Sequence, residues 1–95
     1  MITLNIDLVI QAFDLAQKAR SVFGDVGQDN MITEECGELI TAIARRERGR
    51  GTEAEVDEEA ADVFLVVLGA MNPDAWRVLA RKVERLRGIL NNANG

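Results

Sequence analysis

The stretch "EEAADVFLVVLGAM", residues 58–71, joins a group of acidic positions to the longest apolar run of the chain. At about 100° per residue, the side chains of a helix formed by residues 63–71 point in nearly every direction. A helix that is apolar on all sides is a buried helix, so we expect this segment at the centre of a helical domain. The run of nine residues is far shorter than the ~20 residues that cross a bilayer. The sequence therefore predicts no membrane span.

A second acidic stretch, "EECGEL", comes about twenty residues earlier, at residues 34–39. With Glu34 taken as 0° on a helix, Glu38 lies near 40° and Glu35 near 100°, so the three carboxylates share one sector. Leu39 and Cys36 fall at roughly 140° to 200°, directly beside that sector. These acids are therefore expected to border the core.

Glu59 and Asp62 are three positions apart, which places them on one face of the later helix. Two unit charges 4 Å apart at an effective dielectric of ~20 interact by roughly 4 kcal/mol, so clustered carboxylates need a counter-charge or take up protons. An oxygen-only set of carboxylates suits a hard divalent cation, Mg²⁺ or Mn²⁺. An isolated E-E-x-x-E is usually a solvated helix face. The pairing of two acidic motifs beside apolar faces is what favours a metal site.

Capping signals divide the rest of the chain into four helices. Asn5 or Asp7 can cap a first helix that stops at Gly24, and "GDVGQDN", residues 24–30, reads as a turn. The other predicted boundaries are a second helix from Asp29 or Asn30 to about Arg48, a third from Thr52 through Met71, and a fourth from Asn72 to near Leu90. We therefore expect one all-α domain over residues 1–95, with a compact antiparallel four-helix arrangement that oligomerises through its central helices.

Composition restricts the function classes. The chain has 95 residues, a net charge of −5 and no histidine. A protein without basic excess is a poor ligand for nucleic-acid phosphates, and the lack of histidine removes His-based zinc sites and Ser-His or Cys-His nucleophile pairs. The single cysteine, Cys36, cannot form an internal disulfide, and the start of the chain lacks the features of a secretory signal. A cytoplasmic location is expected.

The order of the motifs resembles a known family. "FGDVGQDNMITEECGELITAIARRERGR" followed by "EEAADV" and the late "KVERL" is similar to the E-E-x-x-E … E-x-x-D signature of the MazG-like nucleotide pyrophosphohydrolases, in the all-α NTP pyrophosphatase superfamily. The likeness covers most of the chain from about Phe23 to Leu86. The chain departs from many relatives at Leu86, where they carry an asparagine.

The resemblance implies Mg²⁺-dependent hydrolysis of a nucleoside triphosphate, such as a dNTP, to a monophosphate and pyrophosphate, with a role in nucleotide-pool house-cleaning. It implies metal ligation by four acids and a catalytic role for Glu34, either as a further ligand or as the base that activates water. Glu35 shares that catalytic assignment. The implied metal ligands are Glu35, Glu38, Glu59 and Asp62, and the implied substrate-binding residues are Gln28, Lys82 and Arg85.

Three other interpretations stay open at the level of sequence. The first is a dUTP or dUDP hydrolase of the same superfamily, and the second is a phosphoribosyl-ATP hydrolase, for which the chain shows no histidine-biosynthesis feature. The third is a non-catalytic helical module that binds metal and dimerises. For the nucleoside triphosphate pyrophosphohydrolase and for the dUTP or dUDP hydrolase alike, the expected working unit is a homo-oligomer, a dimer or a tetramer. The reason is that 95 residues cannot easily cover a helix that is apolar on every side.

Overall fold

The computed structural model describes residues 4–94, and within them the chain forms four helices and no strand. The helices are α1 (Ile6–Phe23), α2 (Asp25–Glu47), α3 (Glu53–Leu68) and α4 (Pro73–Asn94). The expectation of an all-α chain with four helices is confirmed. None of these helices is both long enough and apolar enough to cross a membrane.

Three helix starts follow the capping signals of the sequence. The side-chain oxygen of Asn5 accepts a hydrogen bond from the Leu8 amide at 3.0 Å. Thr52 accepts from the Glu55 amide at 3.2 Å, and Asn72 accepts from the Ala75 amide at 2.8 Å. Each cap satisfies one of the amides that the first turn of a helix leaves without a partner.

The start of the second helix is earlier than the sequence indicated. The predicted turn over residues 24–30 is wrong, because only Gly24 lies outside a helix there and α2 begins at Asp25. Gly24 has φ +88°, which lets one residue reverse the chain. Arg20 then holds the first turns of α2 through ion pairs with Asp25 at 3.0 Å and Asp29 at 2.8 Å. Acidic residues at a helix N-terminus are also favoured by the helix dipole.

The other helix ends differ from expectation by smaller amounts. The third helix ends at Leu68 rather than Met71. Gly69 caps it, and the backbone amide of Gly69 donates hydrogen bonds to the carbonyl oxygens of Val66 and Val67. The fourth helix extends to Asn94 rather than fading near Leu90. Its asparagine-rich end is therefore helical, not a frayed tail.

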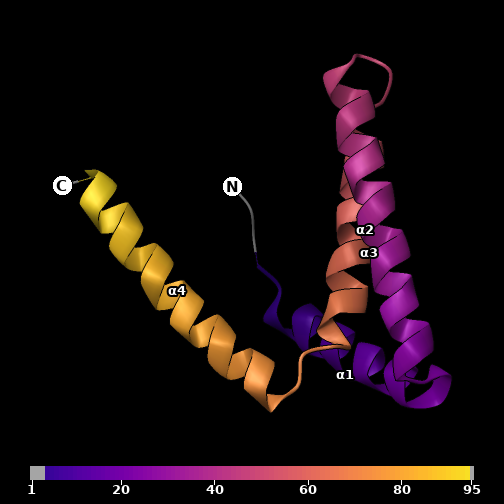
Figure 1. Cartoon of the computed structure of the whole chain (residues 1–95), viewed down its shortest axis with the longest axis vertical. Coiled ribbons are helices and arrows are strands. Elements are labelled where there is room, and N and C mark those ends of the chain that lie inside the picture. The colour runs from indigo at the N-terminus through magenta and orange to yellow at the C-terminus, as the bar shows by residue number, and fades with distance from the viewer. Residues whose placement is uncertain (1–3, 95) are drawn as a thin grey trace.

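Helices α2 and α3 pack side by side as an antiparallel hairpin, α1 crosses the base of that hairpin, and α4 projects away from it (Figure 1). The compact four-helix arrangement expected from the sequence is therefore wrong for the single chain. The radius of gyration is 15.9 Å, against about 12 Å for a compact domain of this length. Within residues 4–94, α4 packs along none of the other three helices, and its contact with α1 is made in its first turn, where Phe13 and Trp76 meet edge to face with ring centroids 5.7 Å apart.

The buried core is small and has two parts, one where α1 meets the base of the hairpin (Ala16 and Leu68) and one between α2 and α3 nearer to the hairpin loop (Ala42 and Val56). Its apolar members are Ala16, Ala42, Val56 and Leu68. Phe64 and Leu65 of α3, expected to be buried, are 55% and 44% exposed. The apolar helix α3 is thus covered on only part of its circumference within one chain.

The junction between α3 and α4 is fastened to α1. The side-chain nitrogen of Gln17 lies 2.9 Å from the Leu68 carbonyl oxygen, 3.2 Å from that of Gly69 and 3.4 Å from that of Met71. A Cβ atom built on Gly69 would stand 2.9 Å from the Ala16 carbonyl oxygen. The absence of a side chain at Gly69 is therefore what allows α1 and the end of α3 to approach.

Replacing Gly69 with alanine should destabilise the fold. The added methyl group meets backbone, which cannot move aside cheaply, and overpacking of this kind typically costs about 1–3 kcal/mol. The measurement is the free energy of unfolding in urea. Gly37→Ala is the control, because no atom lies within 4 Å of its Cβ position and Gly37 is inside α2. That change should stabilise the helix by about 0.5–1 kcal/mol. Equal effects from the two substitutions would contradict the proposed close approach.

Candidate functional site

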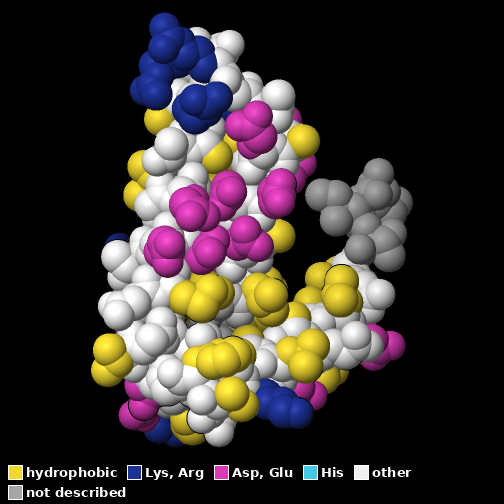
Figure 2. Space-filling model, turned by 90° about the vertical axis from the view of Figure 1, so that its right-hand side faces the viewer, with side chains coloured by type: hydrophobic (Ala, Val, Ile, Leu, Met, Phe, Trp, Pro, Cys, Tyr) yellow, Lys and Arg dark blue, Asp and Glu magenta, His cyan; other side chains and the backbone are white. Residues whose placement is uncertain are grey.

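The acidic residues of the two motifs meet across the α2–α3 hairpin. Oxygen atoms of Glu35 and Glu38 from α2 and of Glu59 from α3 all lie within 4.8 Å of one another. Glu35 and Glu38 are one turn apart on α2, and the antiparallel packing of the helices brings Glu59 opposite them. Figure 2 shows the resulting band of acidic side chains across the hairpin. We call Glu35, Glu38 and Glu59 the acidic cluster.

Two oxygens of this cluster are buried without a partner. Glu35 Oε2 and Glu59 Oε2 are shielded from solvent, and neither has a hydrogen-bond donor within the described part of the chain. A buried polar atom without a partner is costly, and a carboxylate more so than a neutral group. The structure therefore leaves two buried acceptor atoms without a partner, one on each helix of the hairpin.

The electrostatics show the cost of this arrangement. Burial raises the pKa of Glu35, and the negative charges of Glu38 and Asp62 raise it further. Burial also raises the pKa of Glu59, with the Glu38 carboxylate as the next cause. Both shifts mean that the folded chain resists ionisation of these groups in the absence of a cation.

Asp62 and Glu34 stand beside the acidic cluster. Asp62 is half-buried one turn after Glu59 on α3, and its charge acts on both Glu35 and Glu59, although its oxygens fall outside the group within 4.8 Å. Glu34 is exposed, and its charge also raises the pKa of Glu35. The sequence-predicted acids are thus brought together, three at the centre and two at the edge.

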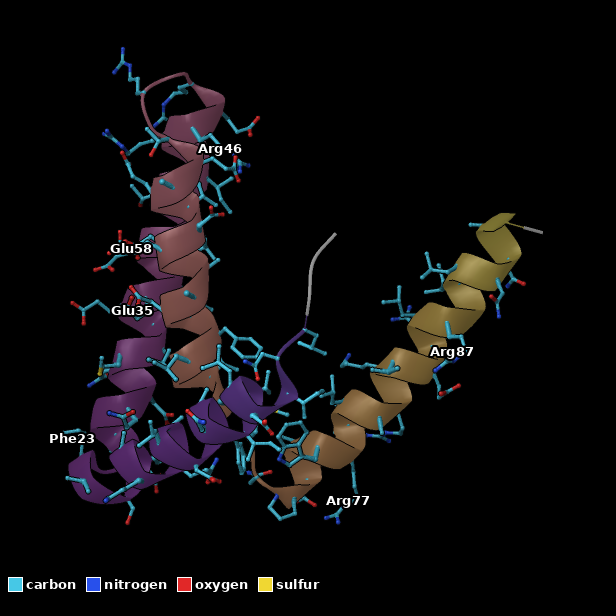
Figure 3. The ribbon with its side chains drawn as sticks, turned by 180° about the vertical axis from the view of Figure 1, so that it is seen from behind. Phe23, Glu35, Arg46, Glu58, Arg77 and Arg87 are labelled. Atoms are coloured by element: carbon cyan, nitrogen blue, oxygen red, sulfur yellow. The ribbon has the colours of Figure 1, made fainter. Side chains whose placement is uncertain are left out.

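A groove of about 500 Å³ runs along the hairpin from the acidic cluster towards the loop at its tip. Glu34, Glu38 and Glu59 contribute to its walls, as do Glu55 and Glu58 of α3. Figure 3 shows Glu35 and Glu58 one above the other along the hairpin, on the way to Arg46 at its tip. The groove extends beyond the residues of the two motifs, because Glu58, which is not part of the E-x-x-D pattern, also lines its wall.

Among residues 4–94, Arg45 is the one basic residue that lines this groove, and the sequence analysis did not single it out. Its position seven residues after Glu38 is the signal that could have found it, since residues seven apart share a helix face. The guanidinium of Arg45 donates to the Arg50 carbonyl at 2.8 Å, which holds the side chain near the loop. Arg46, by contrast, is paired with Glu53 at 3.0 Å and Glu47 at 3.2 Å. The groove thus carries carboxylates along its length and one guanidinium towards the hairpin loop, where Glu55 also lies.

The three predicted substrate-binding residues lie elsewhere. Gln28 is buried, with 6% of its surface exposed, and its amide donates to the Met31 sulfur at 3.7 Å. It lines an apolar pocket of about 310 Å³ between α1, α2 and α3. Lys82 and Arg85 are exposed on α4, which projects away from the hairpin, so the single chain does not bring them to the acidic cluster.

The donor set fits a hard divalent cation. All contributing atoms are carboxylate oxygens, the ligands that Mg²⁺ and Mn²⁺ prefer. The two partnerless oxygens are the atoms that a bound cation would satisfy. The acidic cluster can therefore hold a metal ion with Glu35, Glu38 and Glu59 as ligands.

Comparison with known protein families gives one match. Residues 28–83 match the family model described as the MazG nucleotide pyrophosphohydrolase domain. The matched segment contains both acidic motifs, the hairpin loop and the first half of α4. No curated protein and no solved structure matches the chain significantly.

Neutralising Glu35 should stabilise the metal-free protein at neutral pH. Since the pKa values of Glu35 and Glu59 are raised above the ordinary 4.5, the folded state holds protons more tightly than the unfolded state. Their contribution to stability is full below that ordinary value and is lost as pH rises through the raised values. Glu35→Gln should therefore raise the melting temperature at pH 7.5 in chelator and have a smaller effect at pH 4.5.

Glu84→Gln is the control for this measurement, because Glu84 is exposed on α4 and far from the cluster. It should leave the melting temperature nearly unchanged at both pH values. A lower melting temperature for Glu35→Gln at pH 7.5, in the absence of metal, would contradict the assignment of repulsion at this site.

Proposed function

This chain belongs to the MazG nucleotide pyrophosphohydrolase family, and on that premise we propose that it hydrolyses a nucleoside triphosphate to a monophosphate and pyrophosphate with Mg²⁺. The observation that carries the proposal is the acidic cluster itself: Glu35, Glu38 and Glu59 each bring one oxygen within 4.8 Å of the others, and Glu35 Oε2 and Glu59 Oε2 are buried without a hydrogen-bond partner. A structural acidic surface would place such oxygens in water. Mn²⁺ can substitute for Mg²⁺ in the same donor set.

In this proposal Glu35, Glu38 and Glu59 hold the metal, and Asp62 supports it from the edge of the cluster. When bound, a divalent ion neutralises phosphate charge and lowers the pKa of coordinated water. Glu34 is exposed beside the cluster, so its carboxylate is free to accept the proton of the attacking water. The water oxygen bonds to the α phosphorus while the bond to the bridging oxygen breaks and pyrophosphate leaves. No protein nucleophile is needed, which accords with the lack of histidine.

The residues along the groove indicate which end of a bound nucleotide lies towards the hairpin loop. Arg45 lines the groove at the end towards the hairpin tip, where a guanidinium can bind phosphate oxygens. Gln28 lies in the other direction, seven residues before Glu35 and therefore on the same helix face, about 10 Å away along α2. The apolar pocket beside Gln28, lined by Phe23, Met31 and Leu65, has the character of a site for a nucleobase. We place the phosphates along the groove and the base near Gln28.

The rival enzymatic interpretation is hydrolysis of dUTP or dUDP. It involves the same acidic residues and differs only in the substrate. A non-catalytic module would bind metal and release no pyrophosphate. A panel of canonical and damaged dNTPs that also includes dUTP and dUDP, with Mg²⁺ and assayed for pyrophosphate and for monophosphate, separates all three. Selective turnover of dUTP or dUDP would assign the first rival, and metal binding without turnover of any nucleotide would assign the second.

Neutralising either motif should abolish most of the turnover while leaving the helices intact. Glu38→Gln and Asp62→Asn each keep the side-chain shape and remove one negative charge from the site. We expect losses of about 100-fold or more in kcat, the size typical of removing one group that stabilises transition-state charge. The measurement is pyrophosphate release, with circular dichroism to confirm the helical content.

Asp57→Asn is the matched control, because Asp57 is an exposed aspartate of the same helix as Asp62 and does not line the groove. It should keep kcat within about threefold of the wild type. Turnover near the wild-type level in Glu38→Gln or Asp62→Asn would show that the acidic motifs do not carry the reaction.

A further inference from the structure

The guanidinium of Arg45 carries a positive charge that no carboxylate of the described chain neutralises. It makes no ion pair within residues 4–94, although Glu55 and Glu58 line the same groove. Its one hydrogen bond goes from Nη2 to the carbonyl oxygen of Arg50, which is a neutral acceptor. Figure 2 shows basic side chains at the loop end of the hairpin, next to the acidic band. The positive charge of Arg45 is therefore available to an anion in the groove.

The hairpin loop holds the Arg45 side chain in place. The backbone amide of Arg50 donates to the Arg45 carbonyl oxygen at 2.8 Å, and the Arg45 guanidinium donates to the Arg50 carbonyl oxygen, also at 2.8 Å. Gly51 packs closely as well, since a Cβ atom built on it would stand 3.1 Å from the Arg45 Cβ. A side chain that is already held loses less conformational entropy when it binds a ligand. Arg45 is exposed, so its remaining N–H donors are open to that ligand.

Arg45 lies at a fixed separation from the acidic cluster. It follows Glu38 by seven residues on α2, so the two residues share a helix face and lie about 10 Å apart along the helix axis. The acidic groove includes both residues in its walls. A divalent ion held by the acidic cluster and the guanidinium of Arg45 would thus be two positive points, separated along one groove.

The rest of the groove disfavours anions. Its other charged wall residues are all glutamates, among them Glu55 and Glu58, and like charges brought together in this way repel. An anion therefore gains from the groove only where it contacts the metal ion or Arg45, and it gains most where it contacts both. The groove favours an anion that is long enough to reach both points.

The order of the phosphates in a nucleotide decides which of them reaches Arg45. In the proposed function the α phosphate lies at the metal and the nucleoside lies towards Gln28, so the other phosphates extend towards the hairpin loop. The terminal phosphate of a triphosphate extends furthest, and a diphosphate is shorter by one phosphate group. A guanidinium can bind two oxygens of such a terminal phosphate at once.

We propose that Arg45 binds the terminal phosphate of a nucleoside triphosphate and thereby makes the chain select triphosphates over diphosphates. The inference rests on the proposed function for the positions of the metal and of the α phosphate. It adds a specificity that the acidic motifs do not supply, because the metal contacts the α phosphate of either kind of nucleotide. Arg45 is the residue that distinguishes the two lengths.

Binding of inorganic polyphosphates tests this selection without turnover. In excess Mg²⁺, calorimetry should give the wild type a Kd for tripolyphosphate that is about 10-fold or more below its Kd for pyrophosphate, the effect of one charged hydrogen-bonding contact. Arg45→Met keeps a long unbranched side chain and removes the guanidinium. It should bring the two Kd values to within about threefold, because the additional phosphate then contacts only solvent, which screens its charge.

Arg48→Met is the matched control, because Arg48 is an exposed arginine at the same end of the hairpin and does not line the groove. It removes the same charge and should keep the wild-type ratio of the two Kd values. Both variants should retain their helical content by circular dichroism, since neither arginine belongs to the core. The same ratio in Arg45→Met as in the wild type would overturn the inference. So would a wild type that binds both polyphosphates equally or binds neither.

Turnover of a dNTP and of the dNDP with the same base separates this inference from the proposed function. In Arg45→Met, kcat/KM should fall about 10-fold or more for the dNTP and stay nearly unchanged for the dNDP, because only the triphosphate loses a contact. An active Arg45→Met with the wild-type ratio of the two kcat/KM values would overturn the inference and leave the proposed function standing. No turnover by the wild type, together with a loss of polyphosphate selection in Arg45→Met, would overturn the proposed function and support the contact at Arg45.

Discussion

Repulsion among carboxylates held against an apolar core is the constraint on which the rest of this structure depends. Glu35, Glu38 and Glu59 approach within 4.8 Å because α2 and α3 pack as a hairpin, and the packing that brings them together also removes water from two of their oxygens. The raised pKa values of Glu35 and Glu59 record that conflict. A hairpin that gains nothing from the cluster would be more stable with amides or apolar residues at these positions. A bound divalent cation would resolve the conflict by supplying the missing positive charge.

The remaining elements serve to position the hairpin and leave it open. Helix α1 supports its base through the close approach at Gly69 and the hydrogen bonds of Gln17. The same contacts direct α4 outwards, so one apolar face of α3 and the apolar residues Leu79, Val83, Leu86 and Leu90 of α4 stay exposed in the described chain. The hairpin thus carries an acidic groove and an apolar groove lined by Leu39 and Ala60, on adjoining sides of Glu38 and Glu59.

Much of the helical layout could be predicted because it is set locally. Asn5, Thr52 and Asn72 cap helices as their side chains indicate, and helical periodicity was sufficient to place Glu34, Glu35 and Glu38 in one sector. The start of α2 could not be predicted in the same way. Its first turns contain residues that favour turns, and they are held by ion pairs from Arg20 of α1 to Asp25 and Asp29. The direction of α4 depends on Gln17, 51 residues before Leu68, and no local pattern reports such a contact. Arg45 could not be singled out, because only the packing of α2 on α3 shows which arginine near the hairpin loop lines the groove.

Calorimetric titration of Mg²⁺ into the metal-free protein at about pH 5.5, repeated in buffers of different ionisation enthalpy, tests the central claim most directly. If Glu35 and Glu59 hold protons that a cation must displace, binding should release protons, and the observed heat should change with the buffer. Glu35→Gln should bind more weakly and release fewer protons. No binding at millimolar Mg²⁺, or binding with the same heat in every buffer, would contradict the account.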